Sequence, residues 1–538
     1  MYAVEIALAA AAAVLVVCYR ILRIGSRENG LPPGPATSPV FGNLLQIPTK
    51  DAYRRFTVWA KDFGDIYSLK VGPGTIVVLS SPAAIKEVLD KQSAYTSDRP
   101  PMALADLVID GWSLFLCRYS DRWRQLRKAA QNLLAPTTVK QYLPLQEAES
   151  TQLQFDILVS PDKFYAHLNR FSNSFVLAII FGKRSPRIET PSAKAISAVI
   201  VRWDEFLGPG ATPPVDIFPI LQWIPERFAP WIKEAREIRR LQTAMYSELM
   251  DECQQRTDAG DGNFFMADVI RDQQTHGMTK DQMRHLAGAI YEAGSSTGSC
   301  FLQGLVLLLA TYPEVQAKAH AEIDRVIGEA RSPVYDDTES LPYVRALIQE
   351  AHRFRTLVPL SLAHRATRDV HYNGYLIPEG ATLFGNIHAV FHDPELFDDP
   401  ETFNPDRFLL TQHGTKPGVD DSNLRSTLIF GTGRRICPGM HLASVSAILA
   451  TMKMLWAFEF RPPLDPATGQ AIKLDIHANH GAVAFCPIPF KCDIRCRSPA
   501  RAEVIRNAFK VDAASTLSAF EYNLSKEDQE WLESVRAG

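Results

Sequence analysis

A ten-residue stretch, FGTGRRICPG, constrains this 538-residue chain more than any other part of it. It contains Phe430, Gly433, Arg435, Cys437 and Gly439. A match to Phe-x-x-Gly-x-Arg-x-Cys-x-Gly arises by chance in roughly one of 10⁴ chains of this length. Glycine lets the backbone turn tightly around a ligand, and a cation beside a thiol favours the thiolate. The pattern therefore predicts that Cys437 is a thiolate ligand of a metal.

An apolar stretch, Met440 to Phe460, follows this loop and predicts a helix. The free N–H groups and the dipole at the start of such a helix would favour negative charge on Cys437. The alternative interpretation is a glycine-rich turn around a buried structural cysteine.

The loop resembles the haem-binding signature of the cytochrome P450 family, and the resemblance continues in family order from near Leu31 to about Cys496. It implies that Cys437 is the proximal thiolate ligand of haem b (iron protoporphyrin IX). Phe430, Gly433 and Gly439 would shape the loop around that ligand. The resemblance also implies a mainly α fold, with one large helical domain and a small β-rich part.

Length alone would predict two to four domains, yet no long linker or internal repeat interrupts residues 41–490. The resemblance implies a membrane anchor and hinge at 1–30, a catalytic domain at 31–497 and a C-terminal extension of unassigned role at 498–538. A net charge of −3 argues against general nucleic-acid binding.

The eight cysteines are scattered, without the paired spacing of a disulfide framework. This distribution favours a reducing compartment. Cys486, Cys492 and Cys496 lie close together near the end, but their spacing matches no zinc motif. We therefore expect free thiols at these three positions.

The N-terminus carries an uncharged apolar run from Ile6 to Tyr19, followed by Arg20, Arg23 and Arg27 and by the Pro-rich stretch Leu31 to Pro35. Apolar residues with basic residues on one side predict a single-pass transmembrane helix with the following domain in the cytosol. This arrangement resembles microsomal members of the family, in the endoplasmic reticulum membrane. A signal peptide is the alternative, but a basic n-region and a convincing cleavage site are missing.

Residues Asp121 to Leu134 predict a basic helix in which Trp123 and Arg127 share one face. Taken alone, such a pair is typical of packing and of a surface. An indole N–H and a guanidinium can each hydrogen-bond a carboxylate. The resemblance assigns five donors to the haem propionates: Trp123, Arg127, His364, Arg365 and Arg435.

Glu350 and Arg353 lie three residues apart in a predicted helix, Leu341 to Arg355, and can pair on one face. The resemblance joins them with Arg407 in a buried salt-bridge triad behind the haem. Such a triad supports the fold, and loss of one member would leave an uncompensated buried charge.

A strand is predicted from Leu357 to Leu362, and the resemblance directs Val358, Leu360 and Ser361 toward the substrate. Segments 100–116 and 201–238 are expected to cover the substrate. Aromatic residues of the second segment, such as Trp203 and Trp223, favour an apolar substrate, although ordinary core packing also explains them.

A long apolar helix is predicted from Thr279 to Tyr312, and the resemblance places oxygen activation at Ala293 to Thr297. The family pattern there is small–Gly–x–acid–Thr. Gly294 and Thr297 match this pattern, whereas Ser296 replaces the acid. Glu292 lies about 40° around the helix from Ser296 and about 140° from Thr297. It is interpreted either as a structural ion-pair partner or as a proton source acting through water.

The resemblance implies a haem-thiolate monooxygenase, most similar to fungal secondary-metabolite members, that inserts oxygen from dioxygen into a small apolar molecule. No nucleotide-binding fingerprint such as G-x-G-x-x-G after a strand is present, so NADPH would act through a separate reductase. Two alternatives remain: a haem-thiolate isomerase or dehydratase that needs no reductase, favoured by Ser296, and a non-catalytic haem sensor.

Overall fold

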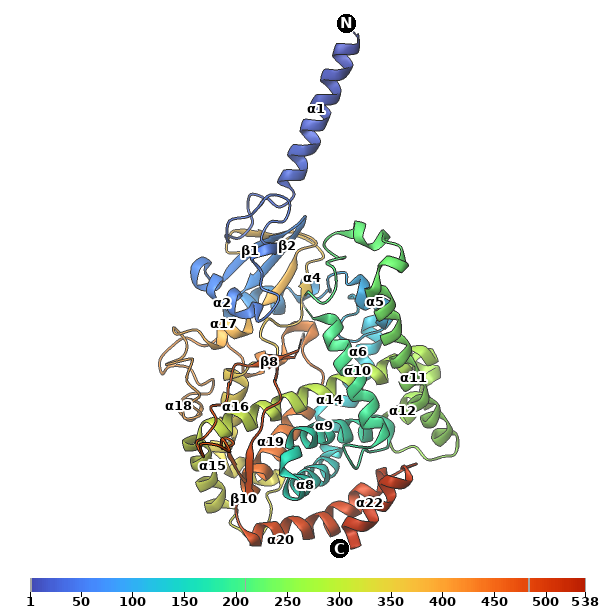
Figure 1. The fold of residues 1–538 in the computed structure, drawn as a ribbon, viewed down its shortest axis with the longest axis vertical. Coiled ribbons are helices and arrows are strands. Elements are labelled where there is room, and N and C mark those ends of the chain that lie inside the picture. Colours follow the sequence, from blue (N-terminus) through green and yellow to red (C-terminus); the bar gives the residue numbers. More distant parts are fainter. Residues whose placement is uncertain (1, 209, 482–483, 538) are drawn as a thin grey trace.

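The computed structural model describes all residues except 1, 209, 482–483 and 538. It is mainly helical, with a small sheet beside the helical body (Figure 1). The helices are α1 Tyr2–Arg23, α2 Ala52–Phe63, α3 Pro82–Ile85, α4 Ser93–Thr96, α5 Ala103–Ile109, α6 Asp121–Leu134, α7 Pro136–Gln141, α8 Leu143–Val159, α9 Phe164–Phe181, α10 Pro191–Leu207, α11 Pro230–Asp258, α12 Phe265–Arg271, α13 Gln273–His276, α14 Lys280–Thr311, α15 Pro313–Val326, α16 Pro342–Phe354, α17 Ile387–Phe391, α18 Arg407–Leu410, α19 Met440–Ala457, α20 Pro499–Ala508, α21 Ala514–Leu517 and α22 Lys526–Ala537.

The strands are short. In the part of the chain that the structure describes, four of them form a sheet of order β1-β2-β6-β3, and the others form the two-stranded pairs β4-β5, β7-β10 and β8-β9. They are β1 Ile66–Val71, β2 Gly74–Leu79, β3 His364–Arg365, β4 Val370–Tyr372, β5 Tyr375–Ile377, β6 Thr382–Gly385, β7 Phe458–Arg461, β8 Asn479–His480, β9 Cys486–Pro487 and β10 Asp493–Cys496. Strand β2 pairs with β1 in an antiparallel hairpin and with β6 in parallel.

Capping residues set the limits of the two helices that matter most for the site. The Thr279 hydroxyl accepts from the backbone N–H of Gln282, and the backbone N–H of Thr279 donates to the side-chain oxygen of Gln282. These two bonds form a capping box at the start of α14. Ser120 accepts from the backbone N–H of Trp123 and starts α6. The predicted helices Thr279 to Tyr312 and Asp121 to Leu134 are therefore confirmed to within a residue at each end.

Two sequence predictions at helix and strand ends are wrong. The helix predicted to continue to Phe460 ends at Ala457, because residues 458–461 pair with β10 as strand β7. The strand predicted from Leu357 to Leu362 does not form. Its backbone instead makes isolated hydrogen bonds: the carbonyl of Pro359 accepts from the N–H of His388, and that of Leu357 accepts from the N–H of Phe485. Ser361 also has a positive φ of 56°, which is incompatible with a strand.

The helical core is built around α14, which packs along α9 and also contacts α19 and α16. Two glycines permit the close approach of α9. A Cβ at Gly294 would lie 2.9 Å from Val176, and one at Gly298 would lie 3.1 Å from Ser172. One side of α14 is thus fixed by packing against α9, and its opposite side is left for the site that the sequence predicts there.

The segments expected to cover the substrate do pack together: Leu104 and Val108 of α5, Phe206 of α10 and Ile238 of α11 belong to one buried apolar cluster. Trp223 does not join them, because 84% of its surface is exposed. Its contribution to an apolar lid, expected from the sequence, is therefore absent from this arrangement.

Helix α1 projects away from the body of the protein (Figure 1). Among the residues that the structure describes, three helices are long and apolar enough to cross a membrane: α1 from Glu5, α14 and α19. The most apolar windows of α14 and α19 are 72% buried inside the protein, whereas that of α1 is 0% buried. Of the three, α1 alone has its apolar surface free for a membrane.

Residues 498–537 pack on the helical core. Ile505, Phe509 and Leu517 are buried in the main hydrophobic cluster, and the ring of Phe509 stacks on Phe155 of α8 with centroids 4.3 Å apart. The extension therefore shares the core of the preceding domain.

Ion pairs fasten the end of the chain to the loop that follows α9. Glu521 pairs with Arg184 at 3.0 Å and with Arg536. The fully buried Asp528 pairs with Arg187 at 2.6 Å and accepts from the Thr190 hydroxyl at 3.1 Å. These contacts explain why the extension is ordered against the body.

We predict that Asp528→Ala destabilises the protein by roughly 3 kcal/mol, because Arg187 and Thr190 lose a buried acceptor. The midpoint of urea unfolding of the haem-loaded protein measures this change. Glu530→Ala is the matched control on the same helix, since Glu530 and its partner Lys526 are exposed and the variant should lose less than about 0.5 kcal/mol. Equal midpoints for the two variants would contradict a fastening role.

Candidate active site

The cysteine loop turns sharply before α19. One short 3₁₀ turn, Ser426–Phe430, leads into the loop, and a second, Gly433–Arg435, lies within it. Gly433 has a φ of 61°, and a Cβ there would lie 2.3 Å from the carbonyl oxygen of Leu89. Only glycine fits this position without a shift of backbone. The backbone N–H of Cys437 donates to the carbonyl of Phe430 at 2.8 Å, which closes the loop. Cys437 then lies three residues before the first residue of α19.

Cys437 is partly exposed at the inner side of the loop, although protein atoms surround most of its thiol. Burial raises its pKa, while the backbone N–H of Gly439 and the charge of Arg127 oppose that rise. Arg435, the cation expected beside the thiol, points elsewhere and donates to the carbonyls of Ser97 and Cys117, each at 2.8 Å. Burial therefore outweighs the loop's own charge, and a bound metal would supply the stabilisation that a thiolate needs.

Three arginines gather beside this loop: Arg99, Arg127 and Arg435. Arg99 donates to the carbonyls of Phe115, Leu362 and Ala363, all within 2.9 Å. Arg127 donates to the carbonyl of Ile436 at 2.6 Å, and its buried Nε has no hydrogen-bond partner. No carboxylate forms an ion pair with any of the three in the part of the chain that the structure describes.

The charges of this arginine cluster (Arg99, Arg127 and Arg435) are not balanced within the protein. Burial lowers the pKa of Arg99 to about 9 and that of Arg435 to about 10, and the charge of Arg435 adds to the effect on Arg99. The nearby carboxylate of Asp98 is already engaged by Arg118 and by the backbone N–H of Tyr119, at 2.7 Å each. A dianionic ligand such as the two haem propionates fits this donor set.

The remaining predicted propionate donors are arranged less uniformly. Trp123 donates its indole N–H to the carbonyl of Leu114 at 3.1 Å and lies under the Arg435 guanidinium at 4.1 Å. Arg365 lies 3.6 Å from the Asp98 carboxylate. The roles of both residues toward a propionate remain predictions.

His364 lies at the same place with a definite tautomer. Its Nδ1 is 2.8 Å from the carbonyl of Thr96, which can only accept, so Nδ1 carries the proton. Burial, with the charge of Arg99, lowers the pKa of His364 to about 3, and the neutral ring then presents an acceptor at Nε2. A propionate would bind this residue only by raising its pKa enough to form the imidazolium.

Sequence reasoning missed Arg99. It lies in an irregular segment, Ser97 to Pro100, that shows no helical or strand period. Its charge is recognisable as unusual only once the fold has buried it without a carboxylate.

Glu350, Arg353 and Arg407 form a buried ion cluster behind the cysteine loop. Arg353 binds both carboxylate oxygens of Glu350, at 2.7 and 2.8 Å, and Arg407 donates to one of them at 3.2 Å. Arg353 also donates to the carbonyl of Phe391 at 2.6 Å. The cluster thus ties α16 to the segment that leads into the cysteine loop.

We predict that Arg353→Ala prevents accumulation of folded, haem-loaded protein, because Glu350 loses its bidentate partner inside the core at a cost of about 3–5 kcal/mol. Haem content per soluble protein is the measurement. Arg345→Ala is the control on the same helix, since Arg345 and its partner Glu339 are largely exposed. Normal haem content with slower turnover in Arg353→Ala would show a role in the reaction instead.

Helix α14 leaves four neighbouring side chains partly exposed deep in the fold: Glu292, Ala293, Ser296 and Thr297. We call them the accessible strip of α14. The Thr297 hydroxyl donates to the carbonyl of Ala293 at 2.8 Å, and that of Ser296 to the carbonyl of Glu292 at 3.2 Å. Each hydroxyl oxygen keeps a lone pair for water or ligand.

The interpretation of Glu292 as an ion-pair partner is wrong. Its Oε1 accepts from Gln242 at 2.8 Å and from the Tyr246 hydroxyl, both neutral groups of α11. No lysine, arginine or histidine pairs with it among the residues described. Burial raises the pKa of Glu292 to about 7, and the two donated hydrogen bonds oppose that rise.

The three residues predicted to face substrate differ in their surroundings. Ser361 accepts from the backbone N–H of Gly385 at 3.0 Å. Leu360 packs against the aromatic cluster of Phe56 and Trp59. Val358 is partly exposed. Their contact with substrate remains a prediction.

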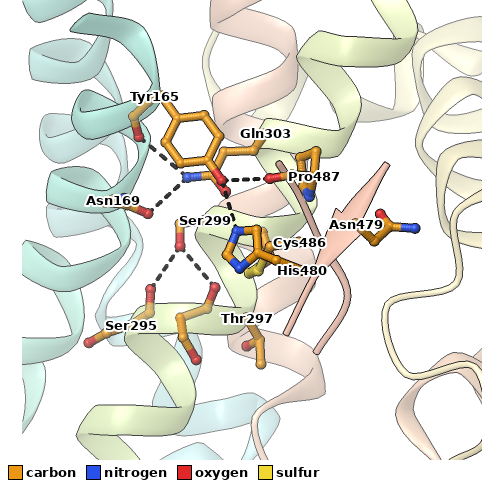
Figure 2. The surroundings of a disulfide bond; sticks show 12 residues. Tyr165, Asn169, Ser295, Thr297, Ser299, Gln303, Asn479, His480, Cys486 and Pro487 are labelled. Atoms are coloured by element: carbon orange, nitrogen blue, oxygen red, sulfur yellow. Dashed lines mark hydrogen bonds between the residues drawn. A yellow bond between two sulfur atoms is a disulfide. The ribbon is translucent and has the colours of Figure 1, made fainter. Parts of the chain in front are cut away.

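Cys300 and Cys486 form a disulfide that joins α14 to β9 (Figure 2). The expectation of a free thiol at Cys486 is therefore wrong, whereas Cys492 and Cys496 are free as expected. Tyr165 of α9 supports the same junction by donating to the carbonyl of Pro487 at 2.8 Å. The cross-link lies one turn beyond the Thr297 hydroxyl.

We predict that digestion of the unreduced protein after alkylation yields one peptide pair linked through Cys300 and Cys486. Mass spectrometry with and without reductant measures this. Cys492 and Cys496 serve as internal controls and should carry the alkylating label in both samples. Label on Cys300 and Cys486 before reduction would contradict the cross-link.

Comparison with known proteins gives one consistent family. The family model described as Cytochrome P450 matches residues 32–474. A cytochrome P450 monooxygenase of Armillaria gallica is 40% identical over 503 residues, covering 93% of this chain and 96% of the relative. Cytochrome P450 monooxygenase yanC of Aspergillus niger is 36% identical over 531 residues, covering 96% and 98%. Cytochrome P450 monooxygenase patI of Penicillium expansum is 36% identical over 510 residues, covering 94% and 95%.

Proposed function

The chain belongs to the cytochrome P450 family and is a monooxygenase, and from this premise we propose that it oxidises a small, mainly apolar intermediate of fungal secondary metabolism with electrons from NADPH. The observation that carries the proposal is the arginine cluster at the cysteine loop, in which Arg435 belongs to the loop, Arg127 donates to Ile436 of the loop, and no carboxylate among the described residues forms an ion pair with any of the three arginines. Apolar residues of α5, α10 and α11, including Leu104 and Phe206, support an apolar substrate.

The residues that would hold haem b come from three parts of the chain: the cysteine loop, the segment around Arg99, and α6. Cys437 would ligate the iron, and Arg99, Arg127 and Arg435 would bind the propionates, with Trp123 beside them. When bound, the haem supplies a thiolate-ligated iron at which dioxygen is activated. The protein's own contribution is to hold the haem in place and to keep competing ligands away from the Cys437 thiol.

The accessible strip of α14 would manage protons. The Thr297 hydroxyl donates to its own helix, so its oxygen is free to accept a hydrogen bond from water and pass a proton along. Ser296 stands where the family has an acid, and a serine hydroxyl relays protons but does not supply them at neutral pH. The proton source is then bulk water reached through this strip.

Electrons would come from a separate NADPH–cytochrome P450 reductase, since no nucleotide fingerprint is present in the sequence. The basic face of α6 supports docking of an acidic partner. Arg122 lies 3.7 Å over the Trp112 ring, and Lys128 is on the same helix.

The proposed location is the endoplasmic reticulum membrane, with α1 as a single span and the catalytic domain in the cytosol. Arg20 and Arg23 end α1 on the side of the body. Arg27 docks onto the body itself, donating to the carbonyls of Gly34, Pro35 and Ser68 at 3.1 Å or less. The body would therefore be held close to the membrane surface.

A haem-thiolate isomerase or dehydratase is the second candidate, and Ser296 is the observation that favours it. Such an enzyme needs no proton supply for dioxygen and no reductase. Substrate turnover with the reductase omitted would select this candidate, whereas turnover that requires both NADPH and reductase selects the monooxygenase.

We predict that Cys437→Ser removes the far-red-shifted Soret band that carbon monoxide gives with the reduced wild-type protein, because an alcohol does not replace the thiolate. Cys117→Ser is the control, since Cys117 is a buried free thiol near the same arginines. Retention of the band in Cys437→Ser would refute the assignment of the ligand.

We predict that Thr297→Ala raises the ratio of hydrogen peroxide to product by about tenfold, because the hydroxyl proposed to relay protons is lost. The ratio of peroxide to product per NADPH oxidised is the measurement. Thr311→Ala is a matched control, since Thr311 makes the same bond to its own helix, at 2.7 Å, fourteen residues further along α14. An unchanged ratio in Thr297→Ala would exclude this strip from proton delivery.

A further inference from the structure

The carboxyl group of Glu292 is held in place by neutral hydrogen-bond donors, without a cation among the described residues. Glu292 lies on α14, and its Oε1 accepts from the Gln242 amide at 2.8 Å and from the Tyr246 hydroxyl. Gln242 and Tyr246 are one turn apart on α11, and both are buried. Two donors on one oxygen fix the orientation of the carboxyl plane.

A glycine makes this arrangement possible. Gly288 lies one turn before Glu292 on α14, and a Cβ there would come within 2.4 Å of the Tyr246 ring. Any other residue at 288 would push Tyr246 away from the carboxyl. Glycine inside a helix costs about 1 kcal/mol relative to alanine. At position 288 this cost is offset by the close contact with the Tyr246 ring that only glycine allows.

The second oxygen of Glu292 has no partner among the residues that the structure describes. The side chain is nevertheless partly exposed, unlike Gln242 and Tyr246 behind it. Since Oε1 already accepts two hydrogen bonds, Oε2 is the oxygen available to a ligand. Burial raises the pKa of Glu292 to about 7, so these surroundings disfavour the charged carboxylate.

Glu292 and Thr297 mark the two edges of the accessible strip of α14. They are separated by about 140° around the helix axis, with Ser296 and Ala293 between them. The other side of the helix is closed by α9, at Val176 and Ser172. The Glu292 side chain therefore leaves α14 on the side away from α9, as the Thr297 side chain does, but the two lie too far apart around the helix to act together directly.

We propose that Glu292 is a specificity-determining residue that binds a hydroxyl group of the substrate through Oε2 and so sets which carbon lies at the reaction centre. The substrate class is then an alcohol or phenol with an otherwise apolar frame. This inference rests on the proposed monooxygenase function and narrows its substrate.

A hydroxyl suits the site better than a cation. An ammonium group would have to be desolvated opposite a buried carboxylate, and the balance of such buried pairs is unfavourable without further hydrogen bonds. A hydroxyl donates one hydrogen bond to Oε2 and needs no compensating charge. A site built to hydrogen-bond a substrate hydroxyl also rejects the analogue that lacks it.

The test is equilibrium dialysis of 2-naphthol and naphthalene against purified, haem-loaded protein. In the wild type, the ratio of the naphthalene Kd to the 2-naphthol Kd should exceed that of Glu292→Ala by about tenfold or more, the effect of one hydrogen bond to an acidic group. Glu292→Gln keeps an oxygen for Tyr246 and Gln242, guards against misfolding, and should show a smaller loss. Asp281→Asn, an exposed acid on the same helix, should leave the ratio unchanged.

Equal Kd ratios in wild type and Glu292→Ala, including failure of both probes to bind, would overturn the proposal. Tighter binding of trimethyl(2-naphthylmethyl)ammonium than of 2-naphthol, abolished in Glu292→Gln, would also overturn it by showing a cation site. The Soret band of the reduced carbon monoxide complex is recorded for every variant. If that band is present and the ratios are equal, only the substrate assignment fails; if wild type lacks it, the proposed function itself fails.

Discussion

Buried positive charge without a carboxylate is the constraint on which the site depends. Arg99, Arg127 and Arg435 donate to backbone carbonyls, among them those of Phe115, Ile436 and Ser97, and these neutral acceptors do not balance three guanidinium groups. Burial without a counter-ion is costly, so the fold is complete only when an anionic group is bound there. The cysteine loop at the same place would supply the iron ligand under the proposed function, and the two features together fit one cofactor with a metal centre and two carboxylates.

Helix α14 turns this binding site into a reaction site by having two unlike sides. Glycines at 294 and 298 let α9 pack against one side, and Gly288 lets Tyr246 approach near the edge of the other. The accessible strip then carries the Thr297 hydroxyl at one edge and the Glu292 carboxyl, held by Gln242 and Tyr246, at the opposite edge. The disulfide from Cys300 to β9 holds the helix in register with the strands beside it. Positioning, rather than mobility, is the property that these contacts provide.

Local patterns predicted most of the fold and much of the site. The long apolar helix from Thr279 to Tyr312 and the i,i+3 pair of Glu350 and Arg353 depend on adjacent residues, and the structure reproduces both. Features that depend on distant partners could not be predicted. The Cys300–Cys486 link spans 186 residues, and Arg99 becomes distinctive only through burial. Likewise, residues 357–362 read as a strand, but their backbone partners come from separate loops.

The most direct test of the central claim is reconstitution of the apoprotein with two forms of iron protoporphyrin IX, the free acid and its dimethyl ester. Both can offer iron to Cys437, but only the free acid offers carboxylates to the arginine cluster. The account predicts that the free acid raises the midpoint of urea unfolding clearly above that of the ester-loaded protein, and that Arg99→Met narrows the difference. Equal midpoints for the two forms in the wild type would contradict the claim that these arginines require an anionic partner.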